Sequence, residues 1–119
     1  MMRKVFIPTI GTLLKLSKDW MPSIYLEYRN MKLLSSVFPD KEEYKSRYYG
    51  RGAEFISSIC FPKGTILKVS RIYVRVGASD YDSVTYTVVK SSRKDLNGRF
   101  WVKLADANQM ECIDDEHVE

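Results

Sequence analysis

A short segment near the start of the chain is echoed in its middle. Residues 11–20 (GTLLKLSKDW) and 64–73 (GTILKVSRIY) share Gly, Thr, Leu, Lys and Ser at the same offsets. A turn glycine followed by threonine and alternating apolar residues is typical of the start of a β-strand. The echo is local, because residues 21–38 have a helical pattern where residues 74–89 have a hairpin pattern. It therefore predicts two strands that meet the same physical demand in one sheet.

From residue 55 onward the sequence has the pattern of consecutive strands. β-Branched and aromatic residues are interrupted by turn clusters at 77–83 (GASDYDS) and 91–98 (SSRKDLNG). The predicted strands are residues 55–60, 65–76, 84–89, 99–104 and 109–113, with one turn of 3₁₀ helix at 105–108.

The long strand at 65–76 changes the parity of its apolar positions. Those positions are Leu67, Val69, Ile72, Val74 and Val76. Side chains alternate strictly along a strand, so the change requires one extra residue, and we predict a β-bulge at Ser70 or Arg71. A strand that bends there can serve two sheets of a small barrel.

This order of elements resembles that of SH3-like small β-barrels. The resemblance covers residues 55–113, and an OB-like barrel is the nearest alternative. Residues 12–18 are expected to join the same barrel as its first strand, which makes 22–52 a helical and loop excursion inserted after it. We therefore expect a mainly β fold with a single domain at 1–113 and an acidic flexible tail at 114–119.

The excursion has its own pattern. Apolar residues recur at helical spacing over 24–38, Pro22 and Ser23 are placed to start a helix, and Pro39 is placed to end it. We expect a helix over much of 24–37. Residues 41–49 fit either a second short helix or a structured loop.

Charge divides the chain into a basic body and an acidic end. All 19 Lys and Arg lie within residues 1–105, whereas 106–119 carry six acids and no base, for a net charge of +4. Such a body attracts phosphate or an acidic protein surface, and it argues against a DNA-mimicking protein. The apolar stretch at 5–16 is interrupted, too short to span a bilayer and without a cleavage site, which predicts a cytoplasmic protein with no membrane partner.

Little in the sequence suits catalysis. The single histidine, His117, lies in the predicted tail, which leaves no Ser-His or Cys-His pair on a rigid frame. Cys60 and Cys112 are expected to be reduced, buried and structural, and they fit no zinc pattern. Asp80 and Asp82 alone are weak evidence for a cation site. We expect a non-enzymatic protein with no metal and no cofactor.

Two basic and aromatic surfaces are candidates for binding. On the outward face of the barrel, cations alternate with aromatic residues, which suits phosphate pairing and base stacking. These residues are Arg71, Tyr73, Arg75, Arg99, Trp101 and Lys103. The second surface, at 45–51 (KSRYYGR), has residue types that often dominate protein interfaces, namely Arg47, Tyr48, Tyr49 and Arg51.

A structural role is the alternative for both surfaces. Outward positions of any alternating strand are polar, and a helix at 24–38 would cover Trp101. The tyrosines of 45–51 would then pack over an edge of the barrel.

Several phrases resemble those of small accessory proteins of tailed bacteriophages. They are IPTIGTLLKLSKDW, SIYLEYRN, FPKGTILKVSRIYVR and RFWVKLADANQ. The resemblance implies a protein of the bacterial host cytosol that binds and modulates a host protein complex, such as a nuclease, a defence system or the polymerase. The alternatives are a direct nucleic-acid-binding small barrel and a structural or virion-associated protein.

Overall fold

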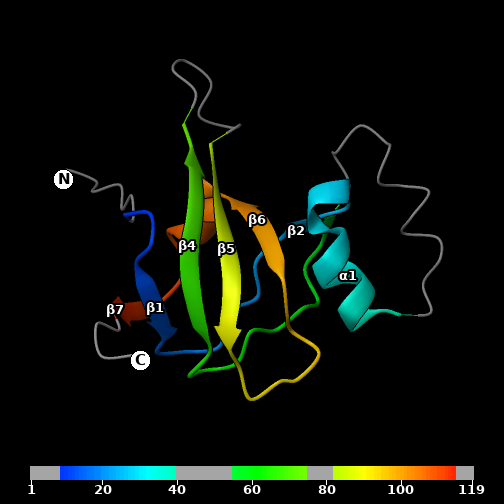
Figure 1. The fold of residues 1–119 in the computed structure, drawn as a ribbon, viewed down its shortest axis with the longest axis horizontal. Helices are drawn as coiled ribbons and strands as arrows, with labels where there is room; N and C mark the ends of the chain where they lie inside the picture. The colour runs from blue at the N-terminus through cyan, green and yellow to red at the C-terminus, as the bar shows by residue number, and fades with distance from the viewer. Residues whose placement is uncertain (1–8, 40–54, 75–81, 115–119) are drawn as a thin grey trace.

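The largest element of the computed structural model is a five-stranded antiparallel sheet (Figure 1). The structure describes residues 9–39, 55–74 and 82–114. The strand order is β6-β5-β4-β1-β7. The bounds are β1 (Leu13–Leu16), β4 (Ile66–Tyr73), β5 (Ser83–Lys90), β6 (Arg99–Lys103) and β7 (Cys112–Asp114). The predicted mainly β fold is confirmed, whereas no closed barrel is detected among these residues and the SH3-like barrel stays a prediction.

The two echoed segments pair with one another. β1 and β4 are antiparallel, and their pairing is centred on Leu14 and Leu67, which hold equivalent places in the two copies. Four backbone hydrogen bonds of 2.7 to 2.9 Å repeat this symmetry: Gly11 N–H to Val69 O, Gly64 N–H to Leu16 O, Val69 N–H to Thr12 O and Leu16 N–H to Thr65 O. The echo therefore encodes a local two-fold arrangement, and the prediction that both strands share one sheet is confirmed.

The turn glycines of both copies have a left-handed backbone. Gly11 has φ of +92° and Gly64 has φ of +91°, and a Cβ added at either position would meet no atom within 4 Å. An alanine there would be strained by its backbone alone. We expect Gly11→Ala and Gly64→Ala each to lower the free energy of unfolding by about 1–2 kcal/mol, measured by urea denaturation. Asparagine, which tolerates positive φ better, should be less destabilising at both sites; equal losses for Ala and Asn would contradict this explanation.

The predicted bulge in β4 is confirmed. The register against β5 shifts between Val69 and Arg71, and a second shift, which the sequence did not predict, lies between Ile66 and Leu67. At the first shift, the hydroxyl groups of Ser70 and Thr87 lie 2.6 Å apart. The bulge restores an alternation in which Arg71 and Tyr73 face solvent.

Val74 was predicted to lie on the inner face of this strand, and this prediction is wrong. Val74 is 52% exposed, because β4 ends at Tyr73 and no longer holds the following residue against the core. Val76 lies outside the described residues.

Aromatic rings fill the core beneath the sheet. The rings of Phe61 and Phe100 are stacked with centroids 4.8 Å apart, and Trp20 lies 5.4 Å from Phe61 and 5.9 Å from Tyr86. Trp20 Nε1–H donates to the backbone oxygen of Asp106, so its polar atom is satisfied. These contacts bury one face of the sheet, whereas the opposite face carries exposed side chains such as Lys15, Lys68 and Arg71.

The helix predicted over 24–37 begins later than expected. Ile24–Tyr25 form the short strand β2, Tyr28–Asn30 form the 3₁₀ turn η1, and only Met31–Val37 form the helix α1. The reason is local: Ile24 and Leu26 are buried on either side of the half-exposed Tyr25, which is a strand-like alternation. The helical periodicity is real only from Met31, where α1 buries Leu33 and Leu34.

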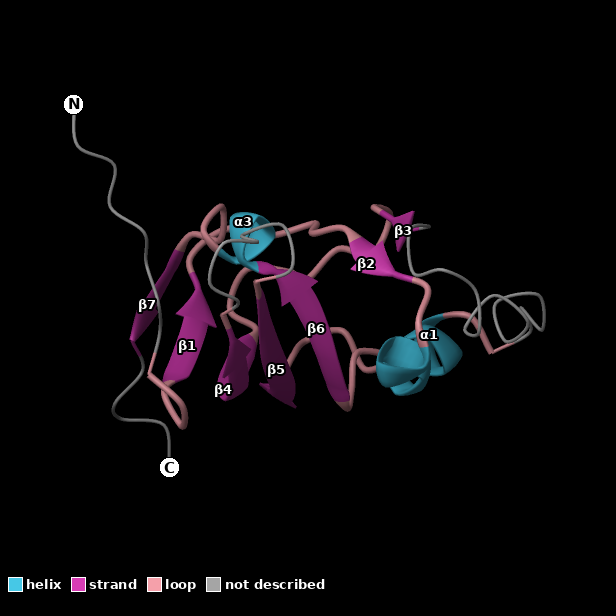
Figure 2. Ribbon diagram, turned by 90° about the horizontal axis from the view of Figure 1, so that it is seen from above, coloured by secondary structure: helices cyan, strands magenta, loops and turns pink. Residues whose placement is uncertain are grey.

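The strand predicted at 55–60 is also shorter and lies elsewhere. β3 (Phe55–Ile56) pairs with β2 in a separate two-stranded sheet rather than with the main sheet. Figure 2 shows β7, β1, β4, β5 and β6 in order across the molecule, with α1 and the β2–β3 pair beyond β6. The described part of the excursion, β2, η1 and α1, thus packs against the β6 edge. Residues 41–49 lie outside the described residues.

The C-terminal elements follow the prediction with small differences. The turn predicted as 3₁₀ at 105–108 is one α-helical turn, α3 (Leu104–Ala107), and the closing strand β7 pairs with β1. β7 includes Asp114, which the sequence analysis assigned to the tail. Cys60 and Cys112 are not joined in a disulfide, and they are partly rather than fully buried. Among the described residues, no helix has the length and apolar character needed to cross a membrane.

Candidate binding face

The side of the main sheet opposite the core is lined by cations. Cross-strand pairing arranges the outward residues of β1, β4, β5 and β6 in four rows. Along β4, these rows are Lys15, Ile66 and Lys90; Leu13, Lys68, Thr87 and Arg99; Arg71, Thr85 and Trp101; and Tyr73, Ser83 and Lys103. We call these four rows the basic face. None of its positions is held by Asp or Glu.

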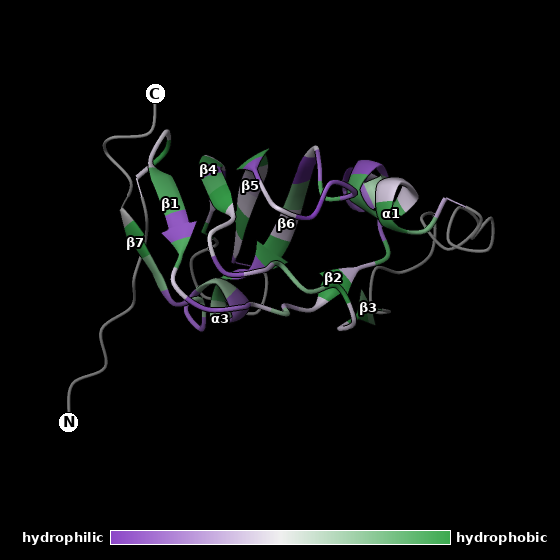
Figure 3. Ribbon diagram, turned by 90° about the horizontal axis from the view of Figure 1, so that it is seen from below, coloured by the Kyte–Doolittle hydropathy of each residue, from purple (hydrophilic) through white to green (hydrophobic). Residues whose placement is uncertain are grey.

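The alternation that creates this face is visible along β1. Its ribbon changes between hydrophobic and hydrophilic colours along its length (Figure 3). Leu14 and Leu16 are buried, whereas Lys15 between them is exposed. The basic face is therefore the direct outcome of a two-residue repeat in which only one side meets the core.

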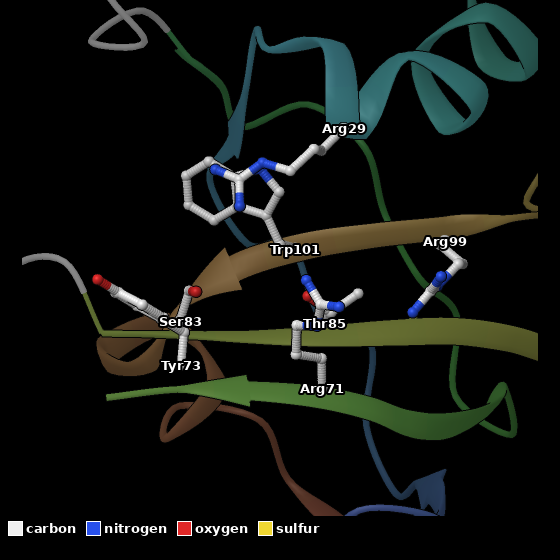
Figure 4. A pocket seen from close by; sticks show the side chains of 7 residues that line it. All are labelled: Arg29, Arg71, Tyr73, Ser83, Thr85, Arg99 and Trp101. Atoms are coloured by element: carbon white, nitrogen blue, oxygen red, sulfur yellow. The ribbon is translucent and has the colours of Figure 1, made fainter. Parts of the chain in front are cut away.

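A pocket of about 250 Å³ opens in the basic face over β4, β5 and β6. It is lined by Arg29, Arg71, Tyr73, Ser83, Thr85, Arg99 and Trp101 (Figure 4). We call it the arginine pocket. The structure thus brings together four of the residues singled out in the sequence: Arg71, Tyr73, Arg99 and Trp101.

The arginines of the pocket differ in their partners. Arg29 forms a two-pronged ion pair with Glu27, with Nη2 donating to Oε2 at 2.8 Å and Nε donating to Oε1. This hydrogen bonding holds the pKa of Arg29 above its already high usual value, so it stays cationic. Arg71 and Arg99 are exposed, and within the described part of the chain neither makes an ion pair or a hydrogen bond through its guanidinium. Two of the three charges are therefore uncompensated.

Trp101 is a wall of the pocket rather than an open stacking platform. It is only 8% exposed. The ring of Tyr25 lies parallel to it with centroids 5.3 Å apart, and the guanidinium carbon of Arg29 is 5.1 Å from its ring centroid. The alternative prediction, that residues 24–38 cover Trp101, is confirmed, although β2 and η1 cover it instead of a long helix. Its buried Nε1 has no hydrogen-bond partner within the described residues.

A buried asparagine fixes this wall to the sheet. Trp101 N–H donates to Asn30 Oδ1 at 2.8 Å, and Asn30 Nδ2 donates to Tyr25 O at 2.9 Å. Asn30 is fully buried. Its amide satisfies a backbone group on the outer edge of β6, where none of the described strands is paired. The 3₁₀ turn that follows Glu27 places Asn30 and Arg29 together over β6.

Lys103 lies on the same face but does not line the arginine pocket. Its Nζ is 5.1 Å from the ring centroid of Tyr25, a cation–π contact that draws it toward β2. The other predicted site residues, Arg47, Tyr48, Tyr49, Arg51 and Arg75, lie outside the described residues.

A second hollow continues the basic face at its other end. It measures about 350 Å³ and is lined by Lys15, Lys63, Gly64, Ile66, Lys90, Ser91, Ser92 and Lys94. We call it the lysine groove. Lys15, Ile66 and Lys90 form the first row of the basic face, so the groove and the arginine pocket lie at opposite ends of β4.

Several residues that line the arginine pocket and the lysine groove were not predicted from the sequence. Ser83 and Thr85 could have been found, because they alternate on β5 opposite residues that were identified. Arg29 and Asn30 gave no such signal, since their place depends on how residues 24–30 pack against β6.

The chemistry available on this face is the binding of anions. Within residues 9–39, 55–74 and 82–114, no group of three or more His, Cys, Asp or Glu side chains is placed to hold a metal ion.

Comparison with known proteins finds no matching family model, no matching curated protein and no matching solved structure.

Proposed function

We propose that the chain is a non-enzymatic binding protein whose basic face binds the phosphate backbone of single-stranded nucleic acid. One observation carries the proposal: six cations share the face, and its rows contain no carboxylate. These cations are Lys15, Lys68, Arg71, Lys90, Arg99 and Lys103. Tyr73, which is 49% exposed, adds an aromatic ring on which a base can stack.

We further propose an SH3-like topology for the fold that presents this face. Three features support it: β1 lies between the long bent strand β4 and the closing strand β7, β4, β5 and β6 follow one another in the sheet, and a single helical turn precedes β7. The proposed binding does not require the barrel to close, because it uses only one face of the sheet.

A protein partner is the second candidate. Two aromatic side chains beside the β6 edge are unusually open, with Tyr28 63% and Phe55 50% exposed. Exposed aromatic residues next to a cationic surface suit an acidic protein partner. On the resemblance to phage accessory proteins, this partner would be a host protein complex in the bacterial cytoplasm.

Salt dependence tests the first candidate. We expect a fluorescently labelled oligothymidylate to bind the full chain, with log K falling linearly against log salt by about 0.7 for each phosphate neutralised. The double substitution Lys68→Gln with Lys90→Gln should reduce that slope by about 1.4, because it removes two phosphate contacts. Fluorescence anisotropy at several salt concentrations measures both quantities.

A matched control separates the effect of the basic face from the effect of net charge. Lys18→Gln with Lys32→Gln removes the same charge from exposed positions outside the basic face, and it should leave the slope nearly unchanged. Absence of oligonucleotide binding at low salt would reject the first candidate. Capture of a bacterial protein complex that survives nuclease treatment would then favour the second.

A further inference from the structure

We propose that the arginine pocket is a subsite for the terminal phosphomonoester of a nucleotide, with the base against Tyr73. This inference rests on the proposed function, since the rest of the strand would follow the basic face toward the lysine groove. It goes beyond that function because it assigns to the arginine pocket a preference for a terminal phosphate, which the other rows of the basic face do not have.

The charge of the pocket matches a phosphomonoester. Glu27 compensates Arg29, whereas Arg71 and Arg99 have no partner within the described residues. A phosphomonoester carries a charge of about −1.5 to −2 at neutral pH, and an internal diester carries only a single charge. The two uncompensated guanidinium groups therefore balance a terminal phosphate better than an internal one.

The donors of the pocket converge on the middle strand. Figure 4 shows Arg71 extending from β4 toward Thr85 and Arg99 pointing from β6 toward the same strand. Thr85 is the cross-strand partner of both Arg71 and Trp101, so its hydroxyl group lies on the floor between the walls. A guanidinium presents its donors in a planar fork that pairs with two oxygens of one phosphate. Two such forks and a hydroxyl group can serve the three free oxygens of a phosphomonoester.

The walls of the pocket favour a strand end. Trp101 and the overlying Arg29 stand on the β6 side, where Asn30 and Tyr25 hold the indole in place. The exposed cations of the preceding rows lead along β4 from Lys68 to the lysine groove, whereas Lys103 beyond Trp101 is drawn toward the ring of Tyr25. A strand that follows these lysines from the groove reaches the walled pocket last, which would place its terminal phosphate there.

The test compares oligonucleotide ends at one fixed salt concentration. Three thymidylate strands of equal length carry a 5′-phosphate, a 3′-phosphate or hydroxyl groups at both ends, and anisotropy reports their binding to the full chain. We expect one phosphorylated strand to bind roughly tenfold more tightly than the hydroxyl strand, because it gains charge-assisted hydrogen bonds. Whichever end shows the preference gives the polarity of the bound strand.

Variants locate the preference in the pocket. Arg71→Gln and Arg99→Gln should each remove most of it, and Arg71→Lys should keep only part, because lysine retains the charge without the fork. Lys68→Gln is the matched control on the same face: it should weaken all three strands alike and preserve the preference. Unchanged circular dichroism and melting temperature show that these exposed substitutions leave the fold intact.

The outcomes distinguish this inference from the function on which it rests. Equal, salt-dependent binding of all three strands would overturn the terminal-phosphate subsite and leave the basic face as a nucleic-acid site. Binding of thymidine monophosphate without binding of any strand would reject the proposed function and support the pocket as a site for free nucleotides. If neither strands nor mononucleotide bind, both proposals are wrong.

Discussion

Phe100→Ala is expected to lower the free energy of unfolding by about 3–5 kcal/mol. Phe100 is fully buried on the inner side of β6, and its ring lies 4.8 Å from that of Phe61, 5.8 Å from that of Tyr86 and 6.4 Å from that of Trp20. Truncation removes this apolar area and leaves a cavity that three rigid rings cannot collapse to fill. Urea denaturation followed by circular dichroism measures the loss. Since small domains have a total stability of only about 5–15 kcal/mol, the measurement should be made at low temperature.

Val74→Ala is the matched control for this experiment. Its side chain is 52% exposed, so we expect the free energy of unfolding to change by less than about 0.5 kcal/mol. The parity of the apolar positions alone would have placed Val74 in the core and predicted a large loss of unfolding free energy for Val74→Ala. Similar effects of Phe100→Ala and Val74→Ala would mean that the inner face of the sheet is assigned wrongly.

The parts of the fold that the sequence predicts are those fixed by strand alternation. The bulge near Ser70 follows from a parity change that no regular strand can absorb, and the pairing of β1 with β4 follows from a repeated turn and strand. The structure of the excursion was harder to predict, because Ile24 belongs both to a helical repeat with Tyr28 and Met31 and to a strand repeat with Leu26. Only their contact with the core decides between the two.

The contrast between strand alternation and packing also explains which features of the site could be predicted from the sequence. Arg71, Tyr73, Arg99 and Trp101 share a face because each strand alternates, and that information is local to each strand. The exposure of Trp101 depends instead on Tyr25 and on the turn that follows it, both far away in sequence. Alternation places a side chain on a face, but it does not say what packs over it.

Asn30→Ala is expected to lower the free energy of unfolding by about 1–3 kcal/mol and to loosen the arginine pocket. The substitution removes the acceptor of Trp101 N–H, which leaves a buried backbone donor without its partner, and it removes one of the two donors to Tyr25 O, which keeps its bond from Glu27 N–H. An unsatisfied buried group loses its hydration without replacement, so the loss exceeds that of an exposed hydrogen bond. Urea denaturation gives the stability.

Asn97→Ala is the control, because the amide of Asn97 makes an exposed bond to Ser36 Oγ at 3.2 Å and its loss should change stability by less than about 0.5 kcal/mol. Hydrogen exchange gives the more specific result. The Trp101 amide hydrogen should exchange faster in Asn30→Ala than in Asn97→Ala when both are compared at conditions of equal global stability. Equal exchange rates would show that Asn30 does not hold the edge of β6, and the wall of the pocket would then depend on the stacking of Tyr25 on Trp101 alone.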